Sequence, residues 1–161
     1  MTACVPRRLV LVALALTVGG CPCGKPAKPE ALPVHELCLE SSPRLNWYDG
    51  RSHTVFVRIF QLSSVDAFAQ TDPGRLLDLQ TPLPGAEGPV IERTVYPETK
   101  TSVRISEQLA AEYVGLVAAF YRLDGSGKTY VSMKSLDKGP CIRLGANAIE
   151  SPPAAPEAPK K

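Results

Sequence analysis

Short stretches in which apolar and polar residues alternate predict a domain made mostly of β-strands. Residues 54–62 alternate β-branched residues with Phe56 and Phe60, so this strand is expected to be covered on both faces. Lys100–Ile105 alternates strictly and predicts a strand with one buried and one wet face. Tyr113–Leu123 is the most apolar segment beyond the N-terminal region and predicts a central strand.

Turn and capping signals divide the rest of the domain into further short elements. More strands are expected at Leu37–Leu45, Val90–Tyr96, Lys128–Leu136 and Cys141–Leu144, and a hairpin turn at Asp124–Gly127. Short helices are expected after Ser63 or Ser64, which are candidate N-caps, and at Asp72-Pro73, where proline would take the first helical position. Six or seven strands with brief helices predict an all-β fold with short helices, arranged as a two-sheet β-sandwich.

The N-terminus has a different pattern, because Arg7 and Arg8 precede an uninterrupted apolar and small run from Leu9 to Gly20. This run is shorter than the roughly 20 residues that span a bilayer, and it is typical of a secretory signal peptide. It ends in Val18-Gly19-Gly20-Cys21, a lipobox. The sequence therefore predicts cleavage after residue 20 and acylation of Cys21. The alternative is an ordinary cleaved signal peptide with a coincidental cysteine.

Composition divides the remainder into three parts. Residues 21–36 are punctuated by proline and predict an extended tether. Residues 37–145 contain the predicted strands and form the β-sandwich domain. Residues 146–161 are rich in proline and alanine and are expected to be a disordered tail.

Charge and cysteine content narrow the possible partners and the compartment. Without Arg7 and Arg8 the chain carries 16 basic and 16 acidic residues, and no basic block is interleaved with aromatic residues, so a nucleic-acid partner is not expected. The predicted export would place the chain in an oxidising compartment, where disulfides can form. Cys38 and Cys141 lie in apolar, strand-like surroundings near opposite ends of the domain and are the favoured pair, which leaves Cys23 as the odd thiol.

Candidate catalytic motifs are incomplete. Gly125-Ser126-Gly127-Lys128-Thr129 resembles the end of a phosphate-binding loop, but Arg122 stands where the first glycine is required and a strand follows, so no nucleotide is expected. His35-Glu36 lacks the second histidine of a helical zinc site, and no cysteine or histidine pair has metal-finger spacing. No nucleophile has an evident base and orienting acid. The sequence therefore predicts neither an enzyme nor a metal or cofactor site.

The polar connection before residue 54 is the stronger functional candidate. It contains Asn46, Trp47, Tyr48, Asp49, Gly50, Arg51, Ser52 and His53, with a turn signal at Asp49-Gly50. Tryptophan, tyrosine and arginine are enriched at the energetic centres of protein interfaces. Trp47 either contributes to such an interface or plugs the edge of the sandwich core, and the sequence leaves both readings open.

Several segments, taken in order, resemble the TssJ family of type VI secretion outer-membrane lipoproteins. They are the lipobox, Leu45-Asn46, Gly50-Arg51-Ser52, Val55–Leu62, Phe68, Leu76-Leu77 and Tyr113–Arg122. The chain departs from the family pattern at Thr54, where proline is usual, and near Tyr130, where tryptophan is common.

This resemblance implies a transthyretin-like two-sheet β-sandwich, anchored by its lipid to the periplasmic face of the outer membrane. It also implies binding to the periplasmic domain of the inner-membrane protein TssM through the first connection, here Asn46–His53. The alternative is a periplasmic adaptor or ligand-binding lipoprotein of another envelope machine.

Overall fold

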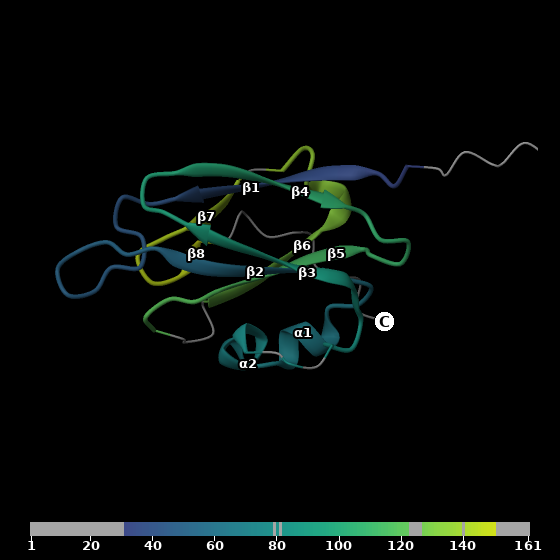
Figure 1. Ribbon diagram of the computed structural model, residues 1–161, viewed down its shortest axis with the longest axis horizontal. Helices are drawn as coiled ribbons and strands as arrows, with labels where there is room; N and C mark the ends of the chain where they lie inside the picture. The colour runs from purple at the N-terminus through teal and green to yellow at the C-terminus, as the bar shows by residue number, and fades with distance from the viewer. Residues whose placement is uncertain (1–30, 79, 81, 123–126, 140, 151–161) are drawn as a thin grey trace, which may run out of the picture. The chain divides into compact units, whose positions relative to one another are not determined.

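Two four-stranded sheets form the folded part of the chain, as Figure 1 shows. The structure is a computed structural model and describes residues 31–78, 80, 82–122, 127–139 and 141–150. In order, the first sheet contains β4 (Lys100–Ser106), β1 (Val34–Ser41), β7 (Ile142–Leu144) and β8 (Ile149–Glu150). The second contains β3 (Ala86–Val95), β2 (Val55–Leu62), β5 (Tyr113–Ala118) and β6 (Lys128–Ser132). Paired strands are antiparallel except β1 and β7, which run parallel.

The main core lies between the two sheets and follows from the period-2 alternation of the strands. Leu37 and Leu39 of β1 face Val57 and Ile59 of β2 within one cluster of buried residues, and Leu116 of β5 belongs to the same cluster. Burial of this kind is the chief stabilising term for a domain of this size. The all-β sandwich predicted from the strand patterns is confirmed.

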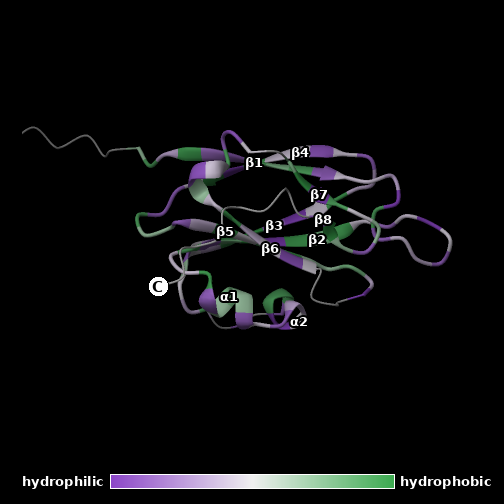
Figure 2. Ribbon diagram, turned by 180° about the vertical axis from the view of Figure 1, so that it is seen from behind, coloured by the Kyte–Doolittle hydropathy of each residue, from purple (hydrophilic) through white to green (hydrophobic). Residues whose placement is uncertain are grey.

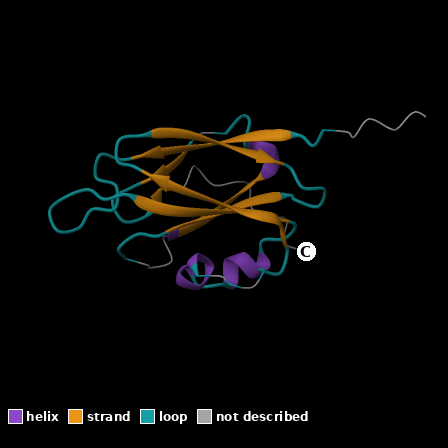
Figure 3. Cartoon of the chain, in the orientation of Figure 1, coloured by secondary structure: helices purple, strands orange, loops and turns teal. Residues whose placement is uncertain are grey.

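A smaller core covers part of the outer face of the second sheet. Helices α1 (Asp66–Gln70) and α2 (Pro73–Leu77) lie across that face, below the sheet in Figure 3. Phe68 and Leu76 pack there against Phe60, and all three are at most 1% exposed. Phe56, on the same face of β2, is 37% exposed. The prediction that β2 is covered on both faces therefore holds only at the Phe60 end, because the helices are too short to reach Phe56.

Gly115 of β5 is required by this second core. A Cβ atom at Gly115 would lie 2.8 Å from Cε2 of Phe68 and 2.9 Å from Cδ1 of Leu62. We expect Gly115→Ala to lower the free energy of unfolding by about 1–3 kcal/mol, since overpacking a filled core forces side chains off their rotamers. Urea unfolding would measure this change, and a loss of less than about 0.5 kcal/mol would contradict the packing argument.

Lys128, which the sequence placed in an incomplete phosphate-binding motif, has a structural role here. Its Nζ donates hydrogen bonds to the carbonyl oxygens of Phe68, Ala69 and Thr71 at 3.2, 2.6 and 2.6 Å. Burial lowers the pKa of this ammonium group. The cation satisfies carbonyls at the C-terminal end of α1 and fastens the helix to β6.

Some elements differ from the boundaries that the sequence suggested. β1 begins at Val34 and ends at Ser41. Asp72 caps α2 by accepting from Gly74 N, as predicted. The N-cap position of α1 is Val65, one residue after Ser64, whose Oγ accepts from the amide of Asp66, the first residue of the helix, at 3.3 Å. The chain also continues in the sandwich through residue 150, past the predicted end at 145. Ile149 is 7% exposed and its burial beside β7 explains this extra strand.

A disulfide joins Cys38 and Cys141 across the first sheet. The two residues stand next to the paired residues Leu39 and Ile142 of the parallel strands β1 and β7. Their Cα atoms are 4.5 Å apart, and their sequence separation is 103. The bond therefore fixes a strand of only three residues to the middle of the sheet.

Other expectations fall on residues that the structure does not describe. They are the signal peptide, Cys21, Cys23, most of the tether, the hairpin turn at 124–126 and the tail from 151 onward. Within the described ranges, no helix combines the length and the hydrophobicity that crossing a membrane requires.

Candidate partner-binding site

The connection between β1 and β2 is a small hairpin that projects from one end of the sandwich. Backbone hydrogen bonds of 3.2 Å join Tyr48 and Arg51 in both directions, and Asp49 and Gly50 have φ values of 52° and 74°. Two consecutive positive φ angles are those of a type I′ turn, which Asp-Gly adopts readily. Figure 2 shows this loop at the right in hydrophilic to neutral colours.

Asn46 anchors the hairpin to the rest of the domain. Its side chain is buried, donates to the carbonyl of Thr54 at 3.1 Å and accepts from the amide of Tyr121 at 2.7 Å. Its own φ is 46°, a left-handed conformation that asparagine tolerates. Asn46 was predicted as part of the contact loop; its burial gives it a positioning role instead.

The segment after β7 accepts backbone hydrogen bonds from the base of the hairpin. The amide of Asn46 donates to Gly145 O at 3.3 Å, and that of Trp47 donates to Ala146 O at 2.7 Å. A turn from Gly145 to Ala148 closes with a 2.8 Å bond. Residues assigned by composition to a disordered tail are thus part of the support of the candidate site, because their backbone supplies the acceptors that the loop needs.

Three rings stack in a row beside the hairpin. Tyr48 lies 3.6 Å from His53 between ring centroids, with an interplanar angle of 9°, and 4.6 Å from Tyr121 on its other side, at 17°. The Nε2 of His53 also lies 3.3 Å from the carbonyl oxygen of Tyr48. Tyr121 is 68% exposed. The stack presents an aromatic surface whose side chains are already ordered.

Trp47 lies on the outside of the domain and does not plug the core. It is 39% exposed, and the guanidinium of Arg44 lies 5.5 Å from its ring centroid. Asp49 and Arg51 are exposed at the tip, and Ser52 donates to the carbonyl of Pro43 at the base. The surface thus combines aromatic rings with arginine side chains, the residue types that carry much of the energy of protein interfaces.

Tyr121 also belongs to this surface, although the sequence analysis did not identify it as a site residue. The expected strand Tyr113–Leu123 ends at Ala118, where Phe120 turns into the core. Tyr121 then faces outward, and its amide bonds to Asn46 in place of a neighbouring strand. The apolar run that begins in β5 ends at Phe120, and the change to Tyr121 and Arg122 was the available signal.

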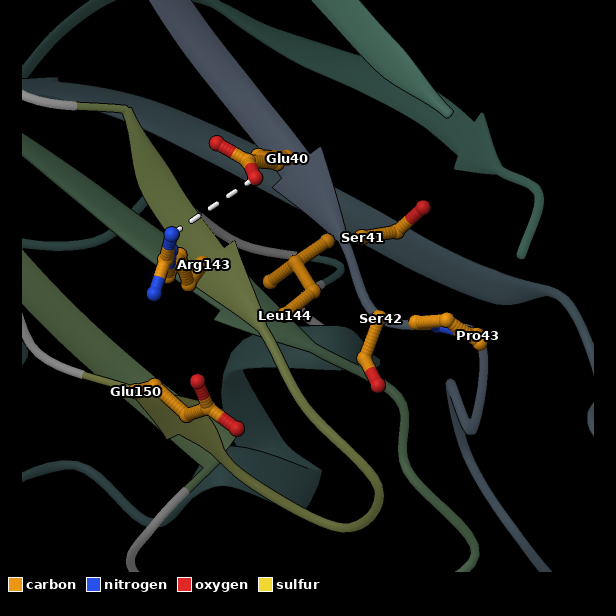
Figure 4. Close-up of a pocket in the computed structure, with 7 residues that line it drawn as sticks. All are labelled: Glu40, Ser41, Ser42, Pro43, Arg143, Leu144 and Glu150. Carbon is orange, nitrogen blue, oxygen red and sulfur yellow. Dashed lines mark ion pairs between the residues drawn. The ribbon is translucent and has the colours of Figure 1, made fainter. Parts of the chain in front are cut away.

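A shallow pocket adjoins the base of the hairpin and is drawn in Figure 4. Glu40 and Arg143 form an ion pair of 3.7 Å across β1 and β7, and Glu150 of β8 is paired in register with Arg143. Ser42 and Pro43, where the chain leaves β1, line the same hollow. The side chains of this pocket form a charged surface next to the hairpin, and this surface extends the candidate interface.

A histidine bound by two carboxylates lies at the opposite end of the sandwich. His35 Nε2 is 2.9 Å from Glu107 Oε2, and His35 Nδ1 is 2.8 Å from Asp137 Oδ2. Since carboxylates only accept, both ring nitrogens must donate, and these hydrogen bonds, first with Glu107 and then with Asp137, raise the pKa of His35 above 6.5. The hydrogen bond with His35 lowers the pKa of Asp137.

These shifts predict a pH-dependent contribution to stability. The raised pKa means that the His35 contribution is complete below pH 6.5 and is lost as pH rises through the folded value. We expect His35→Gln to lower the melting temperature by about 2–4 °C near pH 5.5, as for a partly exposed ion pair, and by less at pH 8.5. Thermal melts of both proteins across this range test this; an equal difference at both ends would contradict it.

Among the described residues, no group of three or more histidine, cysteine or acidic side chains could hold a metal ion. In the same ranges, every buried side-chain nitrogen or oxygen has a hydrogen-bond partner. The hairpin and its ring stack carry aromatic and arginine side chains, residue types that are enriched where proteins recognise one another.

Fold and surface together define a class: a transthyretin-like β-sandwich with two short helices on one sheet and an ordered aromatic loop at one end. A family model described as type VI secretion lipoprotein, with VasD, EvfM and TssJ among its members, matches residues 33–148. The chain belongs to this family of type VI secretion lipoproteins.

Solved structures show the same fold at low sequence identity. TssJ1 from Pseudomonas aeruginosa, a type VI lipoprotein, is 24% identical with a TM-score of 0.63, over 78% of this chain and 99% of that one. A chain in a structure titled "Type VI membrane complex" is 21% identical with a TM-score of 0.67, covering 76% and 99%. A chain in a structure titled for the TssM C-terminal domain from EAEC is 19% identical with a TM-score of 0.65, covering 75% and 98%. Comparison with curated proteins gave no significant match.

Proposed function

We propose that this chain is a non-enzymatic structural lipoprotein that binds the periplasmic domain of TssM. In this proposal, acylated Cys21 holds it at the periplasmic face of the outer membrane. Residues 47–53 of the hairpin and Tyr121 contact the partner, and Asn46 positions them. The single observation that carries the partner proposal is the ring stack of His53, Tyr48 and Tyr121 at the end of a domain of this family, half-buried at His53 and Tyr48 and exposed at Tyr121.

The comparisons support the choice of partner. One similar chain comes from a structure titled for a TssM C-terminal domain, and another from a type VI membrane complex. A pre-ordered aromatic surface loses little side-chain entropy on binding. A lipid tether would also raise the effective concentration of the domain near a partner that is held in the inner membrane, so a modest interface suffices.

Co-purification tests the partner directly. The acylated full-length protein, extracted in detergent, is expected to retain the TssM periplasmic domain encoded in the same genome on an affinity column. The periplasmic domain of an unrelated inner-membrane protein serves as the control. Failure to retain TssM at micromolar concentrations of both proteins would contradict the proposal.

The anchor gives a separate prediction. Cys21→Ser removes the thiol that would carry the diacylglycerol, so the protein should move from the membrane to the soluble periplasmic fraction. Cys23→Ser is the matched control and should leave the protein in the membrane fraction. Fractionation followed by immunoblotting measures this, and a Cys21→Ser protein that stays with outer membranes would exclude the proposed anchor.

A further inference from the structure

An apolar turn lies at the end of the sandwich opposite the hairpin. Leu109, in the connection between β4 and β5, is 99% exposed. In Figure 2 this connection carries hydrophobic colour at the left, the end at which β1 begins. Leu32 and Val34, at the start of the folded chain, are 42% and 57% exposed. Three exposed aliphatic side chains therefore belong to this end of the domain, and contact surfaces form where such residues make a patch.

Backbone contacts bring these aliphatic residues together. Val34 pairs with Ser106 at the end of β4, and the amide of Glu107 donates to Pro33 O at 2.8 Å. The connection that carries Leu109 therefore leaves the sheet beside Leu32 and Val34. The three side chains belong to one end of the domain, although Leu109 lies more than 70 positions from the other two in the sequence.

Hydrogen bonds fix the turn that carries Leu109, so the exposure of this side chain is a feature of the folded structure. Ala111 N bonds to Gln108 O at 2.9 Å, which leaves Leu109 and Ala110 at the tip. The amide of Gln108 donates at 3.0 Å to the side chain of Gln61, which is 3% exposed. Turn tips favour glycine, proline, asparagine, aspartate or serine, so the geometry of the turn does not account for leucine here.

The length of chain before the domain indicates what covers this surface. Ala31 follows Cys21 by ten positions, which at full extension span at most about 36 Å. A tether of this length lets the domain contact the bilayer, but it does not determine which end of the domain makes the contact. Charge does not determine the end either, since Glu107 and Glu112 line the same hollow as Leu109 and Lys134. The apolar turn would make that choice.

We propose that the turn at Leu109, with Leu32 and Val34, lies against the phospholipid surface that holds the acyl anchor. This inference rests on the proposed lipid anchor. β1 extends over eight residues between the two ends of the sandwich, so contact at the turn directs the hairpin of residues 46–53 away from the membrane. The domain is then oriented as well as tethered.

Fluorescence quenching tests the orientation. Trp47 is the only tryptophan, so Trp47→Phe provides a background free of indole. Leu109→Trp and, as matched control, Tyr96→Trp are made in it; Tyr96 is 59% exposed and bonds through its carbonyl to Ser41 at the hairpin end. The acylated full-length proteins are placed in phosphatidylethanolamine and phosphatidylglycerol vesicles with brominated acyl chains.

The Leu109→Trp protein is expected to lose roughly half of its emission, since indole rings settle at the headgroup level. The Tyr96→Trp protein should be little quenched. In the unaltered protein, amide exchange at Leu109 and Ala110 should be slower on vesicles than in the Cys21→Ser protein. Equal quenching of the two variants, or unchanged exchange, in protein that floats with vesicles would overturn this proposal and leave the anchor intact. Protein that does not float would exclude the anchor and this inference with it.

Discussion

Replacing Cys38 and Cys141 together by serine is expected to lower the free energy of unfolding by about 4–5 kcal/mol. The disulfide closes a loop with a sequence separation of 103 residues, and in the chain-entropy model its loss restores that freedom to the unfolded state. The free energy of unfolding of a small domain is about 5–15 kcal/mol, so this change removes a large part of the stability of the domain.

Guanidinium unfolding of the two proteins measures the difference, with Cys23→Ser as the matched control for loss of a thiol outside the domain. β7 has three residues, so its pairing with β1 should be the first structure lost in the double variant. Faster amide exchange in residues 142–150 would report this. A loss of stability below about 1 kcal/mol would contradict the role given to the bond.

Trp47→Ala combined with Tyr121→Ala is expected to weaken binding to the TssM periplasmic domain by about 100-fold or more. Loss of two exposed aromatic residues at the centre of an interface commonly costs more than 2 kcal/mol. Both side chains lie outside the sheet core, at 39% and 68% exposed, so the melting temperature should change by only a few degrees. Isothermal titration calorimetry measures the affinity.

Tyr130→Ala is the control for this pair of substitutions. Tyr130 is 44% exposed and lies on β6, opposite Gly115 in register and away from the hairpin. Its loss should leave the affinity within about threefold of the parent protein, as expected outside an interface. Unchanged binding by the Trp47 and Tyr121 variant would place the interface elsewhere on the domain.

The sandwich could be predicted because its strands carry strong local signals. The alternation in β2 and β4 and the apolar run of β5 reflect which side chains face the core, and this depends on neighbours two positions away. Asp72-Pro73 likewise specified the start of α2 through a cap that the structure retains. Such features are local and therefore visible in the sequence.

The support of the candidate site could not be predicted in the same way. Asn46 bonds to Tyr121, 75 residues away, and the hairpin rests on Gly145 and Ala146, which have no local pattern. Trp47 could be read as core or surface because its exposure depends on where that distant backbone lies. Long-range backbone pairing decided each of these placements.

Site-specific photocrosslinking tests most directly whether the hairpin of residues 46–53 binds the TssM periplasmic domain. A photoreactive amino acid replaces Arg51, which is exposed at the tip, or Tyr130 on the side of the sandwich, in the acylated protein in cells that produce TssM. Crosslinks to the TssM periplasmic domain are expected from position 51 and not from position 130. Crosslinks from position 130 alone, or from neither position while the two proteins co-purify, would contradict the account.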